Sequence, residues 1–332
     1  MAPTWQRENW QKAMAQAIRD PATLLARLEL PADLLPAATQ AAMQFPLRVP
    51  LSYLSRMEKG NPNDPLLRQV LPVAAELQEH PAFVTDPVGD LAAMAAPGLL
   101  HKYQGRALLI TTGACAVHCR YCFRRHYPYQ QGSISAGQLD EALAYVAQDS
   151  SITELILSGG DPLSLSNARL SSLQEQISRL PHIQRLRLHT RLPVVLPERI
   201  DAGFLDWVAH CPQQLVMVIH CNHAQEIDDP LASALQALRQ SGVTLLNQAV
   251  LLRGINDELA CQQQLSERLF AVGVLPYYLH QLDRVKGAQH FEVSDAHAIE
   301  LHTALRHSLP GYLVPRLVRE MAGEATKTPL TL

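Results

Sequence analysis

The sequence predicts an α/β fold in which six strand–helix units form a curved, partly closed parallel barrel. Six short apolar runs between residues 106 and 280 alternate with helical stretches. This alternation is typical of a parallel sheet with right-handed crossovers. The last four runs recur about every 30 residues, which is the length of one strand–helix unit.

The first of three predicted segments, residues 1–100, has a helical and proline-punctuated pattern. Trp10, Met14 and Ile18 fit an amphipathic period, and Asp20-Pro21 is a typical start for a second helix. No residue pattern in this segment indicates chemistry.

The second segment, residues 101–290, contains the predicted barrel. Strands are expected in RALLITT, TELILSGG, RLRLHTR, LVMVIH, TLLNQAVLL and GVLPYYLH. Helices are expected near 136–149, 166–180, 198–210, 229–241 and 257–272. The third segment, residues 291–332, adds a helix near 294–308, a strand within YLVPRLVRE and a polar tail.

Each apolar run of the predicted barrel is followed by polar residues or glycine. These ends are Thr111 to Gly113, Ser158 to Asp161, His189 to Arg191, His220 to His223, Asn247-Gln248 and His280 to Asp283. In parallel αβ folds the active site lies at the carboxyl ends of the strands. We therefore expect these side chains to share one mouth of the barrel.

Cys115, Cys119 and Cys122 directly follow the first predicted strand, with the spacing C-x3-C-x2-C. Thiolate is the usual protein ligand of 4Fe–4S clusters, and three cysteines hold three of the four irons. The fourth iron is then left without a local protein ligand and can chelate a substrate and pass it one electron. The spacing thus indicates catalysis rather than simple electron carriage.

Two alternatives to a cluster stay open at this point. A structural zinc ion would take four ligands, with His118 or His126 as the nearby fourth. Zinc is the weaker interpretation, because no second Cys/His pair has zinc-ribbon spacing. The third interpretation is chance clustering of core thiols, and buried free thiols are what we expect of Cys211, Cys221 and Cys261.

Composition excludes several other classes of protein. Hydrophobic residues make up 47% of the 332 residues and charged residues 18%, which is typical of a globular enzyme. The net charge of −3 indicates neither a nucleic-acid partner nor an anionic membrane. No apolar run approaches the ~18 residues of a membrane helix. We expect a cytoplasmic protein, where a reducing compartment suits an oxygen-sensitive cluster.

The cysteine stretch has the form C-x3-C-x-aromatic-C, the signature of radical S-adenosylmethionine (SAM) enzymes, and the chain resembles the lysine 2,3-aminomutase family over residues 40–330. The resemblance rests on CRYCFRRH, SGGDPL, RLPVVLPERI, HCNHAQEI, LLNQAVLLRGIND, LPYYLHQLDRVKGAQHF and GYLVPRLVRE. It is similar to the short branch that makes β-lysine for modification of elongation factor P. This resemblance implies a partial (βα)6 TIM-like radical SAM barrel.

The resemblance also implies an activity. The chain would be an isomerase, an intramolecular aminotransferase that converts L-α-lysine to β-lysine in the R form. Its cofactors would be a 4Fe–4S cluster, SAM and pyridoxal 5′-phosphate (PLP). Three other free amino acids stay open as substrates: ornithine, arginine and glutamate. Glutamate is the least compatible of them, because the acidic residues Asp283 and Glu320 favour a cationic side chain. A binding or regulatory iron–sulfur or zinc protein is the alternative from a different class, and a lysine-catabolic aminomutase is another.

Roles for individual residues follow from the same resemblance. Cys115, Cys119 and Cys122 would bind the cluster, and Lys327 would be the catalytic lysine that forms a Schiff base with PLP. The positions implied for SAM are Ser158, Gly159, Gly160, Asp161, His220 and Gln248, with Asn222 and His223 lining the SAM and PLP site. The further positions implied for PLP are Lys102, Tyr103 and Arg106.

The substrate's charges indicate which residues would bind it. Arg124, two residues beyond the last cysteine of the motif, is suited to the carboxylate. Asp283 and Glu320 follow predicted strands and would bind the distal ammonium. The family uses two aspartates there, so Glu320 is one methylene longer. Two further departures are Lys102 in place of an arginine, and Gly-Glu-Ala-Thr in place of a glycine run before Lys327.

The expected partners are few. They are free L-lysine and an electron donor such as flavodoxin or ferredoxin, with no nucleic acid and no membrane. A separate ligase would attach the product to elongation factor P, and we expect no stable contact with it. Homo-oligomers are compatible with the family, but the chain does not show the cysteine-bearing C-terminal extension of the longer members.

Overall fold

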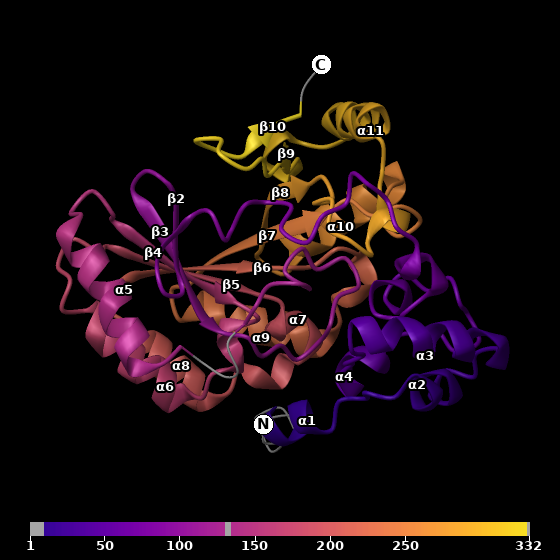
Figure 1. The fold of residues 1–332 in the computed structure, drawn as a ribbon, viewed down its shortest axis with the longest axis horizontal. Coiled ribbons are helices and arrows are strands. Elements are labelled where there is room, and N and C mark those ends of the chain that lie inside the picture. The colour runs from indigo at the N-terminus through magenta and orange to yellow at the C-terminus, as the bar shows by residue number, and fades with distance from the viewer. Residues whose placement is uncertain (1–9, 130–133, 331–332) are drawn as a thin grey trace.

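The computed structural model describes residues 10–129 and 134–330. Residues 1–9 of the expected helical segment and residues 331–332 of the expected tail lie outside this description. Within it, ten strands form a single sheet, and their spatial order follows the order of the chain. Figure 1 shows this sheet beside a group of N-terminal helices, with the C-terminal part of the chain above.

Seven strands of the sheet are parallel, and three short ones at its two edges are antiparallel. The strands are β1 (Met94–Ala96), β2 (Leu99–Tyr103), β3 (Arg106–Thr112), β4 (Glu154–Gly159), β5 (Arg185–Thr190), β6 (Gln214–Ile219), β7 (Thr244–Val250), β8 (Leu275–His280), β9 (Arg316–Arg319) and β10 (Thr328–Pro329). Because β1 and β10 are its two edges, the described sheet is open rather than a closed barrel. The predicted α/β class with six parallel strands from β3 to β8 is confirmed.

Five of the seven described α-helices that follow these strands begin where a short polar side chain caps them, whereas the helices that begin at Leu192 and Leu259 have no such cap. Ser135, Ser166, Asp201, Asp228 and Ser294 each accept a hydrogen bond from a backbone N–H of the first turn. The helices are α5 (Ala136–Gln148), α6 (Asn167–Ile177), α7 (Leu192–Val195), α8 (Ala202–Ala209), α9 (Asp229–Gln240), α10 (Leu259–Ala271) and α11 (Asp295–Ser308). All except the four-residue α7 lie where the sequence predicts a helix.

The N-terminal segment consists of short helices separated by turns. They are α1 (Trp10–Ala15), α2 (Pro21–Arg27), α3 (Leu35–Gln44) and α4 (Leu51–Leu54). Asp20 caps α2 as predicted, with Pro21 in the first turn. The segment differs from the prediction at its end, where β1 and β2 extend the sheet as an antiparallel hairpin. Here pairing with β3 decides the conformation, and a local pattern does not report such pairing.

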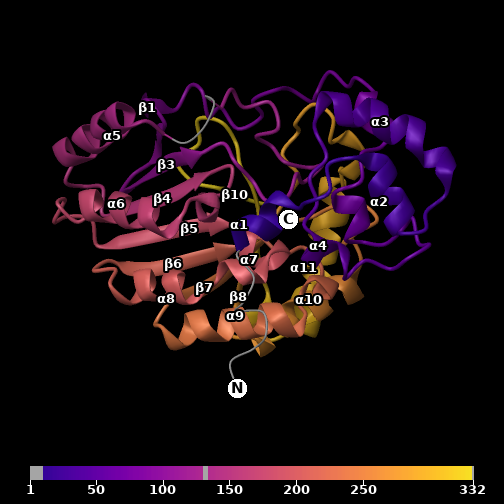
Figure 2. The same ribbon diagram turned by 90° about the horizontal axis from the view of Figure 1, so that it is seen from below.

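The N-terminal helices α2, α3 and α4 lie on the opposite side of the molecule from α5 and α6, as Figures 1 and 2 both show. Polar contacts attach them to α7, the short helix that directly follows β5. Ser52 Oγ donates to the Val195 carbonyl at 2.7 Å, and Arg56 Nη2 donates to the Val194 carbonyl at 2.6 Å. The segment therefore borders the strand ends rather than the outer helices. No helix of the described chain is long and apolar enough to cross a membrane.

Candidate active site

A cavity of about 480 Å³ lies at the carboxyl ends of the parallel strands. Its size is within the usual range of ligand pockets. Nearly all site residues that the sequence and the resemblance indicated line this cavity: Cys115, Cys119, Cys122, Ser158, Gly159, Gly160, Asp161, His220, Asn222, Gln248, Lys102, Tyr103, Arg106, Arg124, Asp283, Glu320 and Lys327. His223 is the exception, because it is not among the lining residues and its Nδ1 accepts from the Gln225 N–H at 3.2 Å. The topology thus brings together residues more than 200 positions apart in the chain.

The three cysteines lie in the loop between β3 and α5, and two arginines of this loop are anchored on Glu76 of the N-terminal segment. Glu76 accepts from Arg120 Nη2 at 2.6 Å and from Arg125 Nη2 at 2.8 Å. These side chains are at most 1% exposed. A buried carboxylate between two guanidiniums fixes the loop on both sides of Cys122.

The loop's first residues are held by the glycine pair that follows β4. The Gly160 N–H donates to the Thr112 carbonyl at 2.7 Å, and a Cβ on Gly160 would lie 2.4 Å from the Ala114 carbonyl oxygen. Gly159 has φ +126°, which disfavours any other residue. The glycines therefore let β4 approach the backbone that leads to Cys115, a role the sequence did not reveal.

Asp161 links two strand ends. Its carboxylate accepts hydrogen bonds from Thr190 Oγ1 at 2.6 Å and from the backbone N–H groups of Leu163, Arg191 and Leu192 at 2.8–3.0 Å. Burial outweighs these donors and raises the pKa of Asp161 to about 6. The Asp161 side chain thus orients the turn after β5. A ligand that donates to this carboxylate would share oxygens that already accept four hydrogen bonds.

Three histidines, His189, His220 and His280, also line the cavity. His220 Nε2 lies 2.8 Å from Gln248 Nε2, and the His189 and His220 rings are 6.1 Å apart. Among the described residues, Nε2 of His189 and Nε2 of His280 have no hydrogen-bond partner. Burial lowers the pKa of His220 to about 3 and that of the other two well below the ordinary value, so neutral imidazoles face the cavity.

Glu320 is the centre of the site near the C-terminal tail. Its carboxylate accepts from Tyr103 Oη at 2.5 Å and from Lys327 Nζ at 2.5 Å, and Lys102 Nζ lies 3.7 Å away. Burial opposes ionisation, yet the Lys327 charge and these donors hold the pKa of Glu320 below its ordinary value. Lys327 Nζ also lies 5.8 Å from the centre of the Tyr278 ring.

Arg124 and Lys102 share Asp90, which the sequence did not indicate. Arg124 Nε and Lys102 Nζ each lie 2.7 Å from an oxygen of Asp90, and Arg124 Nη1 donates to Ser158 Oγ at 3.1 Å. Arg106, by contrast, has no carboxylate within ion-pair distance in the described chain, and its guanidinium lies 4.6 Å from the centre of the Tyr103 ring. Arg106 is thus the cation of this group with a free charge.

Asp283 has a different environment from Glu320. Its Oδ1 is buried, and within residues 10–129 and 134–330 it has no hydrogen-bond partner. Burial raises the pKa of Asp283 to about 7, although the Lys327 charge partly offsets this. An uncompensated buried carboxylate can accept a cationic ligand, because the ligand would supply the missing partner.

Sequence reasoning missed Asp90 and Glu76, and it placed His189, Arg191 and His280 at the shared mouth of the barrel without giving them a role. His189, Arg191 and His280 do follow predicted strands, and this was their only local signal. Asp90, which lines the cavity, and Glu76, which holds two arginines of the cysteine loop, lie in the N-terminal segment, where nothing in the local pattern indicates these contacts.

Comparison with known proteins defines the class first. Residues 109–260 match the family model described as the Radical SAM superfamily. Proteins named L-lysine 2,3-aminomutase are similar over the whole chain: that of Escherichia coli (strain K12) is 48% identical over 98% of this chain and 95% of its own length. The Haemophilus influenzae protein is 47% identical over 97% and 95%, and that of Clostridium subterminale 35% over 84% and 67%. The chain therefore belongs to the lysine 2,3-aminomutase family.

Enzymes of this family use a 4Fe–4S cluster, SAM and PLP. The residues present fit these groups. Three thiols border one cavity, and each would bind a different iron, so they need not converge on one point. No three His, Cys, Asp or Glu side chains of the described residues converge as around a single metal ion. A free guanidinium at Arg106 suits a phosphate, and Lys327 supplies a primary amine at the same wall.

Proposed function

We propose that this chain is an L-lysine 2,3-aminomutase that converts L-α-lysine to β-lysine. The observation that carries the proposal is the composition of one cavity. Cys115, Cys119 and Cys122 line it together with the amine of Lys327 and two acids, Asp283 and Glu320. The relatives with the same name, at 41–48% identity over nearly the whole chain, support this assignment.

The cofactor roles of individual residues belong to the proposal. We assign the cluster to the three cysteines, and SAM to the cavity wall formed by Ser158–Asp161, His220 and Gln248. PLP is assigned to Lys327 and to the group of Lys102, Tyr103 and Arg106. Together these cofactors supply the radical that removes a hydrogen atom from the substrate and the carbonyl that carries its migrating amino group.

The charged residues near the proposed PLP site differ in how readily each could bind the phosphate. Arg106 has no competing carboxylate in the described chain, so it is the primary phosphate ligand. Lys102 would have to loosen its contact with Asp90, 2.7 Å away, to reach a phosphate. Tyr103 holds Glu320 through its hydroxyl, which leaves its ring to support Arg106. Lysine rather than arginine at position 102 is compatible with this secondary role.

For the substrate, Arg124 binds the carboxylate and Asp283 binds the distal ammonium. Asp90 and Ser158 hold Arg124 in place through Nε and Nη1. Asp283 has a buried oxygen that no described residue partners, so a substrate ammonium would complete its hydrogen bonds. Glu320 can serve the same ammonium only after Lys327 leaves it. We infer that Glu320 holds the released Lys327 amine when the substrate occupies the site.

The walls of the cavity have a further task, which is exclusion of water from a reactive radical. Buried neutral histidines and the Tyr277–Tyr278 pair, with ring centres 3.9 Å apart, border the space. Because burial lowers the pKa of His189, His220 and His280, these imidazoles stay neutral near neutral pH. Substrate held between Arg124 and Asp283 would be fixed at both ends, which is what a position-specific hydrogen abstraction requires.

The finer assignments follow the same proposal. We infer that the chain acts in the cytoplasm, receives electrons from a flavodoxin or ferredoxin, and releases (R)-β-lysine for a separate ligase that modifies elongation factor P. The chain spans 95% of the length of the Escherichia coli and Haemophilus influenzae proteins, and this agreement in length supports the short branch. A homo-oligomer is compatible with this role, and stable contact with the ligase is not required.

The deciding experiment is an anaerobic assay of the reconstituted chain with PLP, SAM, dithionite and isotope-labelled L-lysine, followed by chiral analysis. The expected result is (R)-β-lysine that depends on both SAM and PLP. If SAM is cleaved while lysine returns unchanged, the substrate assignment is wrong. The same assay with ornithine and arginine would then identify the amino acid.

A further inference from the structure

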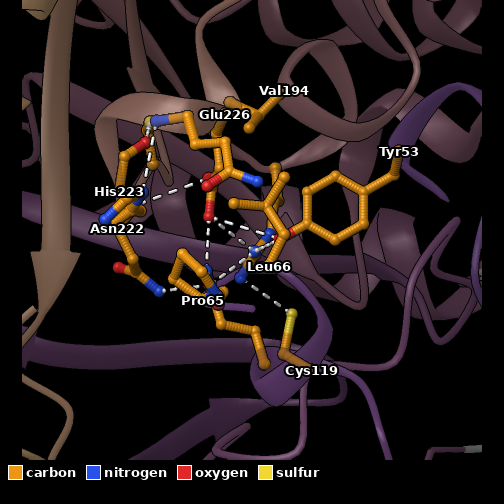
Figure 3. Close-up of polar contacts among 12 residues, drawn as sticks. Tyr53, Pro65, Leu66, Cys119, Val194, Asn222, His223 and Glu226 are labelled. Atoms are coloured by element: carbon orange, nitrogen blue, oxygen red, sulfur yellow. Dashed lines mark hydrogen bonds and ion pairs between the residues drawn. The ribbon is translucent and has the colours of Figure 1, made fainter. Parts of the chain in front are cut away.

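A buried arginine contacts the middle cysteine of the motif. Arg191, the residue after β5, donates from Nη1 to Cys119 Sγ at 3.2 Å. Figure 3 shows Cys119 at the edge of the polar network to which it is joined. Within the described chain this is the one hydrogen bond from a charged side chain to a cysteine sulfur. Nothing in the assigned roles of the cavity residues requires it.

The position of the guanidinium is strongly determined. Its Nη2 donates to Gln69 Oε1 at 2.7 Å, to Tyr53 Oη at 3.1 Å and to Glu226 Oε1 at 3.3 Å. Its central carbon lies 5.6 Å from the ring centres of both Tyr53 and Tyr121. The backbone N–H of Arg191 is fixed as well, because it donates to Asp161 Oδ2 at 2.8 Å.

The N-terminal segment supplies much of this support. Tyr53 and Gln69 are both fully buried, although they precede the sheet by tens of residues. Gln69 Nε2 also donates to Glu226 Oε1 at 2.7 Å, and Tyr53 Oη donates to the same oxygen at 3.3 Å. One carboxylate oxygen is therefore shared by three donors, and the Arg191 charge receives only part of its compensation from Glu226.

Such an arrangement is a poor device for stability alone. A buried ion pair loses about as much in desolvation as it gains, and packed apolar side chains are often as stable. In the described residues, moreover, the buried Nε of Arg191 has no partner. A functional need explains why a cation is held here, within hydrogen-bond distance of a sulfur that would bind iron.

We propose that Arg191 is a positioning residue that raises the reduction potential of the cluster bound at Cys119. The inference rests on the proposed function, since it requires a 4Fe–4S cluster at the three cysteines. One electron from an external low-potential donor takes the cluster core from the 2+ to the 1+ state, so its charge becomes more negative by one. A cation and an N–H···S bond stabilise the reduced state more than the oxidised state.

The N-terminal segment then contributes to the reduction potential of the cluster, because it positions Arg191 and the cysteine loop. Tyr53 and Gln69 hold the guanidinium, while Glu76 holds the loop that carries the cysteines through Arg120 and Arg125. The N-terminal segment therefore supports both the arginine that donates to Cys119 Sγ and the loop that carries this cysteine. Loss of the Arg191 charge should change the potential without removing any ligand of the cluster.

The test compares three variants after anaerobic cluster reconstitution. Arg191→Met removes the charge and the hydrogen bond at similar length. Arg191→Lys keeps the charge but loses the two-pronged guanidinium that reaches Cys119 and Gln69 together. It replaces Arg191→Met in the comparison if the methionine variant does not fold. Arg56→Met is the matched control, because Arg56 joins the N-terminal segment to the carbonyls of Val194 and Glu226 without touching a sulfur. Iron and sulfide content is measured first, then the midpoint potential by redox titration followed by electron paramagnetic resonance.

The expected result is a full cluster in every variant and a more negative midpoint potential in Arg191→Met. At a fixed potential its cluster should be at least about tenfold harder to reduce, which is about 59 mV for one electron. Arg191→Lys should shift less, and Arg56→Met should match the unaltered chain. Equal potentials in all four proteins, or an equal shift in Arg191→Met and Arg56→Met, would overturn the inference. An unaltered chain that binds no iron would instead overturn the proposed function.

Discussion

The two ends of the cavity differ in how their polar groups are satisfied. Around the cysteines, charged side chains are paired with each other: Glu76 with Arg120 and Arg125, and Arg191 with Glu226. Around the tail, buried atoms of His189, His280 and Asp283 have no partner among the described residues. At the cysteine end the buried Nε atoms of Arg125 and Arg191 also have no partner among the described residues, but ion pairs hold both guanidiniums and make this end a rigid frame. At the tail end the unpartnered atoms leave hydrogen bonds for ligands to complete. This contrast fits one permanent cofactor at one end and exchanging molecules at the other.

The largest expected effect comes from removing a ligand at the rigid end. Cys119→Ala should lose bound iron, and product formation should fall by more than ~100-fold, because even indirect neighbours of metal ligands typically matter by 10–100-fold. Iron content and β-lysine formation are the measurements. Cys261→Ala is the control, since Cys261 lies on α10 outside the cavity. Full product formation by Cys119→Ala would refute the cluster assignment.

At the ligand end, the next effect concerns Lys327. Lys327→Ala should abolish the absorbance of bound PLP, because the residue supplies the amine at the cavity wall. The absorbance spectrum of the reconstituted protein checks this. Lys286→Ala provides the comparison, as Lys286 forms an exposed pair with Glu79. Retained PLP absorbance in Lys327→Ala would remove this lysine as the anchor.

The rigid frame itself can be broken at Glu76. Glu76→Gln leaves two buried guanidiniums without their counter-charge, and loss of one partner of a buried pair destabilises by about 3–5 kcal/mol. The thermal melting temperature before cluster reconstitution should therefore fall by several degrees. Glu79→Gln should leave it nearly unchanged, since that residue is 81% exposed. Similar melting temperatures for both variants would mean that Glu76 does not stabilise the loop.

A smaller effect is expected from Asp283 at the ligand end. Asp283→Asn keeps the shape but removes a charge-assisted hydrogen bond worth about 1.5–3 kcal/mol. The KM for L-lysine should rise by about tenfold or more, with a smaller change in kcat. Glu320→Gln should also release Lys327, so its PLP absorbance should change as well. An unchanged KM in Asp283→Asn would exclude this residue from ammonium binding.

The smallest expected effect is the pH dependence that Asp283 gives to the stability of the protein and to its KM for lysine. The pKa of Asp283 is about 7, above its ordinary value, so the folded protein binds a proton there that the unfolded chain has already lost. Relative to Asp283→Asn, stability of the unliganded protein should be greatest at low pH and should decline as pH rises through about 7. Substrate binding needs the carboxylate, so the KM for lysine should rise as pH falls below about 7. Parallel pH profiles in both proteins would contradict this.

The sequence indicated most of the fold, and for a local reason. Strand and helix periods and caps such as Ser135 and Ser294 lie within a few residues of the element that they specify. All six expected strands appear between β3 and β8. The hairpin of β1 and β2 was not indicated, because it depends on an edge of the sheet that β3 provides.

For the site, the sequence by itself determined which chemistry is present: three thiols at cluster spacing, and polar residues after every parallel strand. Only the tertiary structure decided how the charges are matched. Glu76 meets Arg120 across 44 residues, and Arg191 meets Gln69 across 122. Pairing depends on distance in space, burial and desolvation, none of which is a property of a short stretch of sequence. A segment without any catalytic motif therefore proved to hold the cysteine loop.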